Sequence, residues 1–240
     1  DDAVATKPYE LASRLSYFLW GSMPDKELFD LAASGKLNDP AVIETQTRRL
    51  LADKRAVGFV GNFTAQWLSI AKMKTVNINH DLFPRFLYTV HLGERRGQEQ
   101  LFRPTIRDYM HEETVGFISE LIRNNASVMN IVDSSFAYLN EPLAVHYGVD
   151  GVEGLKLRAV PIKPEHRLGG LLTQGSVLVG NSTGSAPHPI YRAVWLREAI
   201  LGDKVKPPPA EVPALSDSVG DSADEAVSIK NLLALHRNKE

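Results

Sequence analysis

The feature that most constrains this fold is a set of apolar side chains that recur every three or four residues through the first 150 positions. The pattern is clearest in residues 8–20, 59–72 and 107–122, where leucine, isoleucine and aromatic residues share one side of a helical wheel. Residues that favour helix N-termini precede several of these runs, namely Ser22 or Asp25, Asp39 before Pro40, and Asn140 before Pro142. This sequence therefore predicts a mostly α fold, an irregular multi-helix bundle.

The last third of the chain is richer in glycine and proline. Residues 155–160 and 176–179 are the two strand candidates, which predicts a small β-hairpin or extended patch in the C-terminal part. A helix is expected from Ile190, followed by a proline-rich strap over 206–213 and a terminal helix over 226–236. We therefore divide the chain into a helical domain, 1–150, and a Gly/Pro-rich domain, 151–240.

Composition excludes several classes of function. The 240 residues contain no cysteine, so they can form no disulfide, no thiolate metal site and no C-x-x-C-H haem attachment. A formal net charge of −2 without a long basic run argues against nucleic-acid binding. No apolar run approaches the ~20 residues of a membrane span. No metal site is expected either, because the adjacent His111, Glu112 and Glu113 lack ligand spacing and fit a solvated helix face.

A second charged group is the basic cluster at the end of the third expected helix. It consists of Arg48, Arg49, Lys54 and Arg55. Charge runs of this kind usually face water. We therefore expect the cluster to form a solvated helix face.

The motif with the most chemical content is residues 180–184, Gly-Asn-Ser-Thr-Gly, which match the G-x-S-x-G pattern of serine hydrolases. Ser182 would be the nucleophile, and Asp217 and His236 would complete a triad in the correct chain order. Two prolines delay the following helix, however, and the alternating strands and helices of that fold are missing. Chance is the simpler explanation, and a hydrolase of esters or lactones through Ser182 is the alternative function.

The same stretch contains a candidate ligand site at the start of the helix that follows. Ser185, His188 and Arg192 surround this helix start. Free N–H groups in the first turn of a helix can hold an anion. The plainer interpretation is a capped helix packed on a buried loop.

Four runs of this chain carry a family resemblance: LASRLSYFLWGSMPDKEL, FTAQWL, FAYLNEPLAVHYGV and RLGGLLTQGSVLVGNSTGSAPHPIYRAVWLREAILGDKVKPPPAEVPAL. The chain resembles the planctomycete-type cytochrome-associated proteins, large secreted bacterial proteins in which several domains of unknown function lie beside a c-type haem segment. Relative to that family, residues 80–105 look like an insertion.

The resemblance implies a non-catalytic structural or partner-binding region of a larger extracytoplasmic protein. It also implies that haem is bound only downstream, where the family's equivalent of the 226–236 helix leads into a cysteine pair and a histidine. The expected partner is that neighbouring haem-bearing segment or another protein.

Overall fold

The computed structural model describes residues 8–86 and 105–206, and these form a mostly α structure, as the sequence predicts. The α-helices are α1 (Pro8–Trp20), α2 (Lys26–Ala33), α3 (Pro40–Ala52), α4 (Val57–Trp67), α5 (Lys72–Thr75), α6 (Ile106–Arg123), α7 (Glu141–Tyr147), α8 (Gly175–Gly180) and α9 (Pro189–Trp195). The strands are β1 (Phe136–Leu139) and β2 (Arg158–Pro161). Short 3₁₀ turns lie at Lys36–Asn38, Lys54–Ala56, Pro84–Phe86, Val128–Ile131, Pro164–His166 and Leu171–Thr173, and a π-helical segment, Leu196–Ile200, follows α9.

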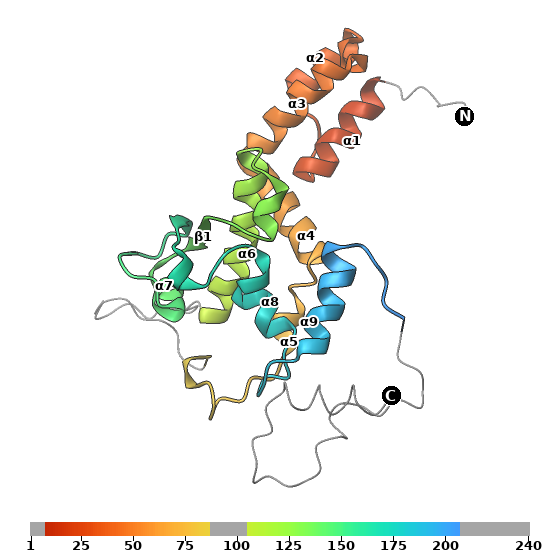
Figure 1. The fold of residues 1–240 in the computed structure, drawn as a ribbon. Coiled ribbons are helices and arrows are strands. Elements are labelled where there is room, and N and C mark those ends of the chain that lie inside the picture. Colours follow the sequence, from red (N-terminus) through yellow and green to blue (C-terminus); the bar gives the residue numbers. More distant parts are fainter. Residues whose placement is uncertain (1–7, 87–104, 207–240) are drawn as a thin grey trace, which may run out of the picture.

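Helices α1 to α3 form an arm that projects from the rest of the molecule (Figure 1). The arm has its own core, in which Leu19, Trp20, Leu28, Leu37 and Leu50 are all buried. Leu19, Leu28 and Leu50 lie on the apolar sides that the helical spacing predicts. The arm is thus a small helical unit that joins the body through α4.

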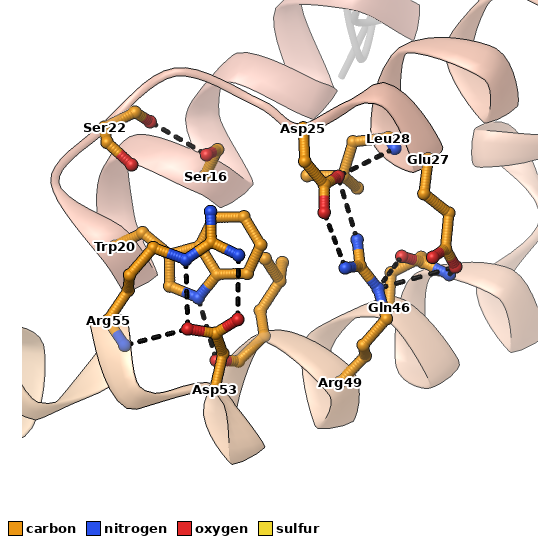
Figure 2. Close-up of polar contacts among 11 residues, drawn as sticks. Ser16, Trp20, Ser22, Asp25, Glu27, Leu28, Gln46, Arg49, Asp53 and Arg55 are labelled. Carbon is orange, nitrogen blue, oxygen red and sulfur yellow. Dashed lines mark hydrogen bonds and ion pairs between the residues drawn. The ribbon is translucent and has the colours of Figure 1, made fainter.

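Polar contacts fix the turns of the arm (Figure 2). Asp25 Oδ1 accepts from the backbone N–H of Leu28 at the start of α2, 3.1 Å away, and Asp25 also accepts two hydrogen bonds from Arg49. The bond from Arg49 lowers the pKa of the Asp25 carboxyl. Asp25 is therefore both a helix cap and the anchor of α3.

Arg48, Lys54 and Arg55 of the basic cluster are exposed, as expected, whereas Arg49 is half-buried. Two side chains of the cluster also make contacts within the arm. Besides the pairing of Arg49 with Asp25, the guanidinium of Arg55 lies 3.3 Å from the ring centroid of Trp20. Arg55 also hydrogen-bonds Asp53, while the indole N–H of Trp20 donates to the Leu50 carbonyl (Figure 2). Two of the four basic side chains thus hold the arm together.

The body is built around α4, α6, α8 and α9 (Figure 1). Val60, Leu68, Phe117, Val177 and Trp195 are buried in one shared cluster. Two indole N–H groups tie α4 to the α9 end of the chain. Trp67 donates to the Ala199 carbonyl over 2.7 Å, and Trp195 donates to the Leu68 carbonyl over 2.8 Å.

The two strands pair antiparallel, from Phe136 opposite Pro161 to Leu139 opposite Arg158. Residues 158–160 are extended as predicted, but their partner strand lies in the first 150 residues, so no local hairpin forms. Domain boundaries at about 150 stay a prediction, although the sheet joins residues from both sides.

The prediction of a strand over 176–179 is wrong, because these residues lie in α8. A short apolar run cannot distinguish a strand from a buried helix by its periodicity alone. Close packing explains the outcome: a Cβ atom on Gly175 would lie 2.6 Å from the sulfur of Met110 on α6. The missing side chain at Gly175 lets the start of α8 lie directly against α6.

Several expectations fall outside the described residues. These are most of the 80–105 insertion, the proline-rich strap from 207 onward and the terminal helix over 226–236. None of the helices within 8–86 and 105–206 is long and apolar enough to cross a bilayer.

Candidate functional site

The loop of residues 181–188, between α8 and α9, is held in one shape by its own backbone. Ser182 and Pro187 form an isolated antiparallel bridge, and the Thr183 N–H donates to the Ala186 carbonyl over 3.0 Å. Gly184 has a φ of +84°, and a Cβ there would lie 2.0 Å from the carbonyl oxygen of Asn77. Glycine is therefore required where the loop touches the chain that follows α5.

The hydroxyl of Ser182 hydrogen-bonds backbone groups of α8 and of this loop. Its hydroxyl donates to the Val179 carbonyl over 2.9 Å and accepts from the Gly184 N–H over 3.1 Å. A nucleophile elbow requires a strand before the serine, and here the preceding segment is helix α8. Asp217 and His236 lie outside the described residues, and within those residues no carboxylate or imidazole hydrogen-bonds Ser182. The strand–turn–helix context that the hydrolase alternative needs is therefore missing.

The three predicted anion ligands lie close together in the chain but differ in surroundings. Ser185 is exposed, and His188 caps α9, its Nδ1 accepting from the Tyr191 N–H at 3.3 Å. Burial lowers the pKa of His188, which favours the neutral ring that such a cap requires. Arg192, one turn into α9, has a buried Nε without a hydrogen-bond partner. Anion binding by this trio stays a prediction.

Two cavities flank the loop, and Ser182 lines both. The first, of about 310 Å³, is walled mainly by apolar side chains and includes Arg192. The second, of about 710 Å³, lies along α9, and its lining includes Trp67, Lys72 and Glu198. The loop therefore separates an apolar cavity from a larger, more polar one.

A buried carboxyl lies on the other side of α8. Glu113 of α6 is 2% exposed, and its Oε2 accepts from the Tyr147 hydroxyl over 2.7 Å. That hydroxyl accepts in turn from the N–H of Gly175 over 2.8 Å. Burial raises the pKa of Glu113 to about 8, against the opposing effect of the bond from Tyr147. Glu113 is therefore mostly protonated at neutral pH.

The hydroxyl of Thr114 continues this polar cluster. It donates to Gln174 Oε1 over 2.7 Å and shares a short hydrogen bond with Ser176. All three of these side chains are buried. We call Glu113, Thr114, Tyr147, Gln174 and Ser176 the buried polar cluster.

The expectation that Glu113 faces solvent is wrong, and the sequence did contain the signal. Tyr109, Glu113 and Phe117 follow one another at four-residue steps, so they share one side of α6. A carboxyl side chain at 113 suggests exposure to solvent, but its position among the apolar residues of α6 indicates burial.

The molecule also exposes a row of aromatic rings along α1 and α4. Neighbouring rings are 4.8 Å apart for Phe18 and Phe59, 6.0 Å for Phe59 and Phe63, and 5.3 Å for Phe63 and Trp67. With Tyr17 they line an open groove of about 680 Å³, which we call the aromatic groove. Phe18 is 68% exposed and Phe63 is 42% exposed. Two of the four rings therefore keep a substantial part of their surface open to water in the described structure.

Residues 6–149 match the family model PSD4, described as a protein of unknown function (DUF1592). The chain belongs to the DUF1592 family. Residues 168–240 match a second model, PSCyt3, also described as a protein of unknown function (DUF1588). The two are planctomycete cytochrome-type domains in tandem, which confirms the suspected family. Comparison with curated proteins gave no match, and comparison with solved structures gave none either.

In this DUF1592 protein the aromatic groove lies in the first matched segment and the loop of residues 181–188 in the second. Neither description assigns an activity. No cluster of three histidine, aspartate or glutamate side chains suited to a metal ion occurs within residues 8–86 and 105–206.

Proposed function

We propose that this chain is a non-catalytic, partner-binding region of a larger extracytoplasmic cytochrome-associated protein. The observation that carries the proposal is the aromatic groove, with Phe18 and Phe63 exposed in a continuous row of rings. Contiguous exposed apolar surface marks interaction sites, and aromatic residues dominate the energetics of such interfaces.

The polar residues of the aromatic groove also suit a protein partner. Asn62 and Gln66 line it together with the rings, and no charged side chain within residues 8–86 and 105–206 does. Depletion of charge at the centre is typical of protein interfaces, and neutral amides can supply hydrogen bonds there without a large desolvation cost. A partner segment with apolar side chains fits this lining.

The partner we propose is the haem-bearing segment of the same parent protein. The cytochrome-type naming of both matched domains supports this. Covalent c-type attachment requires two cysteine thiols and a histidine, and these 240 residues contain no cysteine. Any covalently attached c-type haem of the parent protein would therefore be held by another segment.

The test is a titration of this chain with the separately produced haem-bearing segment, followed by calorimetry. Phe18→Ser combined with Phe63→Ser should weaken binding by more than tenfold, because two apolar anchors are lost. Tyr9→Ser on α1 is the matched control, since Tyr9 is 53% exposed and lies outside the aromatic groove. Absence of binding, or equal binding by the double variant, would contradict the proposal.

The non-catalytic part of the proposal has its own test. The purified chain should not hydrolyse short acyl esters or lactones faster than buffer does, because within the described residues the Ser182 hydroxyl bonds only backbone groups. Turnover that Ser182→Ala abolishes, in a variant that remains folded by circular dichroism, would overturn it.

A further inference from the structure

We propose that the apolar cavity beside the 181–188 loop binds a small monocarboxylate with an apolar body, whose carboxylate pairs with Arg192. This inference is independent of the aromatic groove and of any protein partner.

The cavity has the composition of a site for an amphiphilic molecule. Ile78, Phe83, Phe86, Leu178 and Val179 supply apolar walls from both sides of the loop contact. Its volume of about 310 Å³ is at the lower end of the ~300–1,000 Å³ that is typical of ligand pockets. The apolar body of a small ligand would be removed from water here, which is the main favourable term for such binding.

Among the described residues, Arg192 is the single charged one in the lining of this cavity. Its Nε is buried and has no hydrogen-bond partner, and within the described residues it forms no ion pair. Five other arginines of the described structure do form ion pairs, among them Arg49 with Asp25 and Arg197 with Asp203. Within the described residues no hydrogen bond or ion pair engages this guanidinium, so its charge is available to pair with an anionic ligand in the cavity.

Ser182, the other polar side chain of the lining, is already engaged. Its hydroxyl donates to Val179 and accepts from Gly184. The guanidinium of Arg192 is therefore the group with unused donors at this cavity. Specific recognition of a ligand's polar end depends on Arg192 alone.

A carboxylate suits this arrangement better than a phosphate. One planar guanidinium matches one planar carboxylate in a bidentate pair, and their single charges cancel. Lys72, the nearby cation that could assist a more highly charged group, lines the other cavity. Octanoate and benzoate have the required chemistry, a single carboxylate on an apolar body.

The experiment is a calorimetric titration of the full chain with octanoate, with octanol and with inorganic phosphate. Octanoate should bind, and Arg192→Gln should weaken its binding by at least tenfold while leaving that of octanol unchanged. Ala186→Phe, which adds bulk to an exposed residue of the lining, should weaken both. Arg197→Gln, outside this cavity, is the matched control and should bind octanoate as the wild type does.

A second readout follows the guanidinium directly, so that an effect of Arg192→Gln on folding cannot be mistaken for lost binding. The Nε–H resonance of Arg192 should shift in the wild-type protein when octanoate is added. The proposal is overturned by a failure of octanoate to bind at millimolar concentration, by equal affinity in Arg192→Gln, or by phosphate binding as tightly as octanoate. None of these results bears on the aromatic groove, so this proposal and the proposed function can fail separately.

Discussion

The buried polar cluster around α6 and the aromatic groove along α1 and α4 invert the usual distribution of side chains. In the first, the carboxyl of Glu113 and the hydroxyl of Thr114 lie in the interior, and in the second the rings of Phe18 and Phe63 face water. The interior groups are hydrogen-bonded by residues of the same chain, namely Tyr147, Gln174 and Ser176. No described residue covers the outer faces of the rings.

This contrast separates two roles. Buried polar groups that are satisfied by their own chain contribute to the stability and uniqueness of a fold, and removing one partner is costly. Exposed rings contribute little to folding, because they remain largely in contact with water. Changes in the buried polar cluster should therefore alter the free energy of unfolding, whereas changes in the aromatic groove should alter binding.

The largest expected effect is a pH dependence of stability from Glu113. In the folded chain its pKa is about 8, whereas a free glutamate has a pKa of 4.5. Between these values the folded state holds a proton that the unfolded state has released, so the free energy of unfolding falls as pH rises. Each pKa unit is worth about 1.4 kcal/mol, so Glu113 should cost several kcal/mol of stability between pH 5 and 8.

Urea unfolding at a series of pH values measures this loss. Glu113→Gln, which cannot ionise, should flatten the profile and make the variant more stable than the wild type at pH 8. The neighbouring Glu112→Gln is the control and should keep most of the slope, because Glu112 is exposed, although desolvation also raises its pKa. A wild-type profile that is flat between pH 5 and 8 would mean that Glu113 is not buried as described.

A smaller loss is expected for Tyr147→Phe. This change removes the donor to Glu113 and the acceptor for Gly175, and both groups stay buried. The free energy of unfolding should fall by about 2 kcal/mol at pH 7. Tyr9→Phe is the control, since Tyr9 is exposed and should show no measurable change. Equal stability of the two variants would argue against the buried polar cluster as a determinant of the fold.

Thr114→Val should lower the free energy of unfolding by less than Tyr147→Phe does, about 1 kcal/mol. Thr114 is fully buried, and its hydroxyl joins Gln174 to Ser176. These two groups are uncharged, so the loss of their shared partner costs less than the loss of the donor to Glu113. Thr45→Val on the exposed side of α3 gives the comparison in the same denaturation assay. A loss above that of Tyr147→Phe would contradict this order.

Substitutions in the aromatic groove should have the smallest effect on the free energy of unfolding. Phe18→Ser should change the free energy of unfolding by less than about 0.5 kcal/mol, because the ring is 68% exposed. The adjacent Leu19 is 3% exposed, and Leu19→Ser should destabilise the arm strongly. If Phe18→Ser proved as damaging as Leu19→Ser, the aromatic row would be part of the arm's core and not a free surface.

Most of the helical architecture could be predicted from local signals. Apolar spacing located α1, α3 and α6, and the capping residues Asp25, Asp39 and Asn140 hold the helix starts where the sequence placed them. These features depend on residues only a few positions apart. Local rules are therefore sufficient for them.

The misassigned features depend on contacts between distant residues. Residues 176–179 are helical because α8 packs against α6 at Gly175, a contact that a four-residue apolar run does not encode. The pairing of Arg49 with Asp25 spans 24 positions, and the bond from Tyr147 to Glu113 spans 34. The candidate site was only partly predictable for the same reason. The helix expected from Ile190 begins one residue earlier, at Pro189, but the cavity around Arg192 also needs Ile78 and Phe86.

The reciprocal hydrogen bonds from the indole N–H groups of Trp67 and Trp195 limit how the two matched domains can be separated by recombination. Each ring belongs to one matched segment and donates to a carbonyl of the other. A recombination event that separated the segments would leave both donors without acceptors and would open the cluster that Leu68 and Trp195 share. Selection should therefore keep these two domains together in one protein.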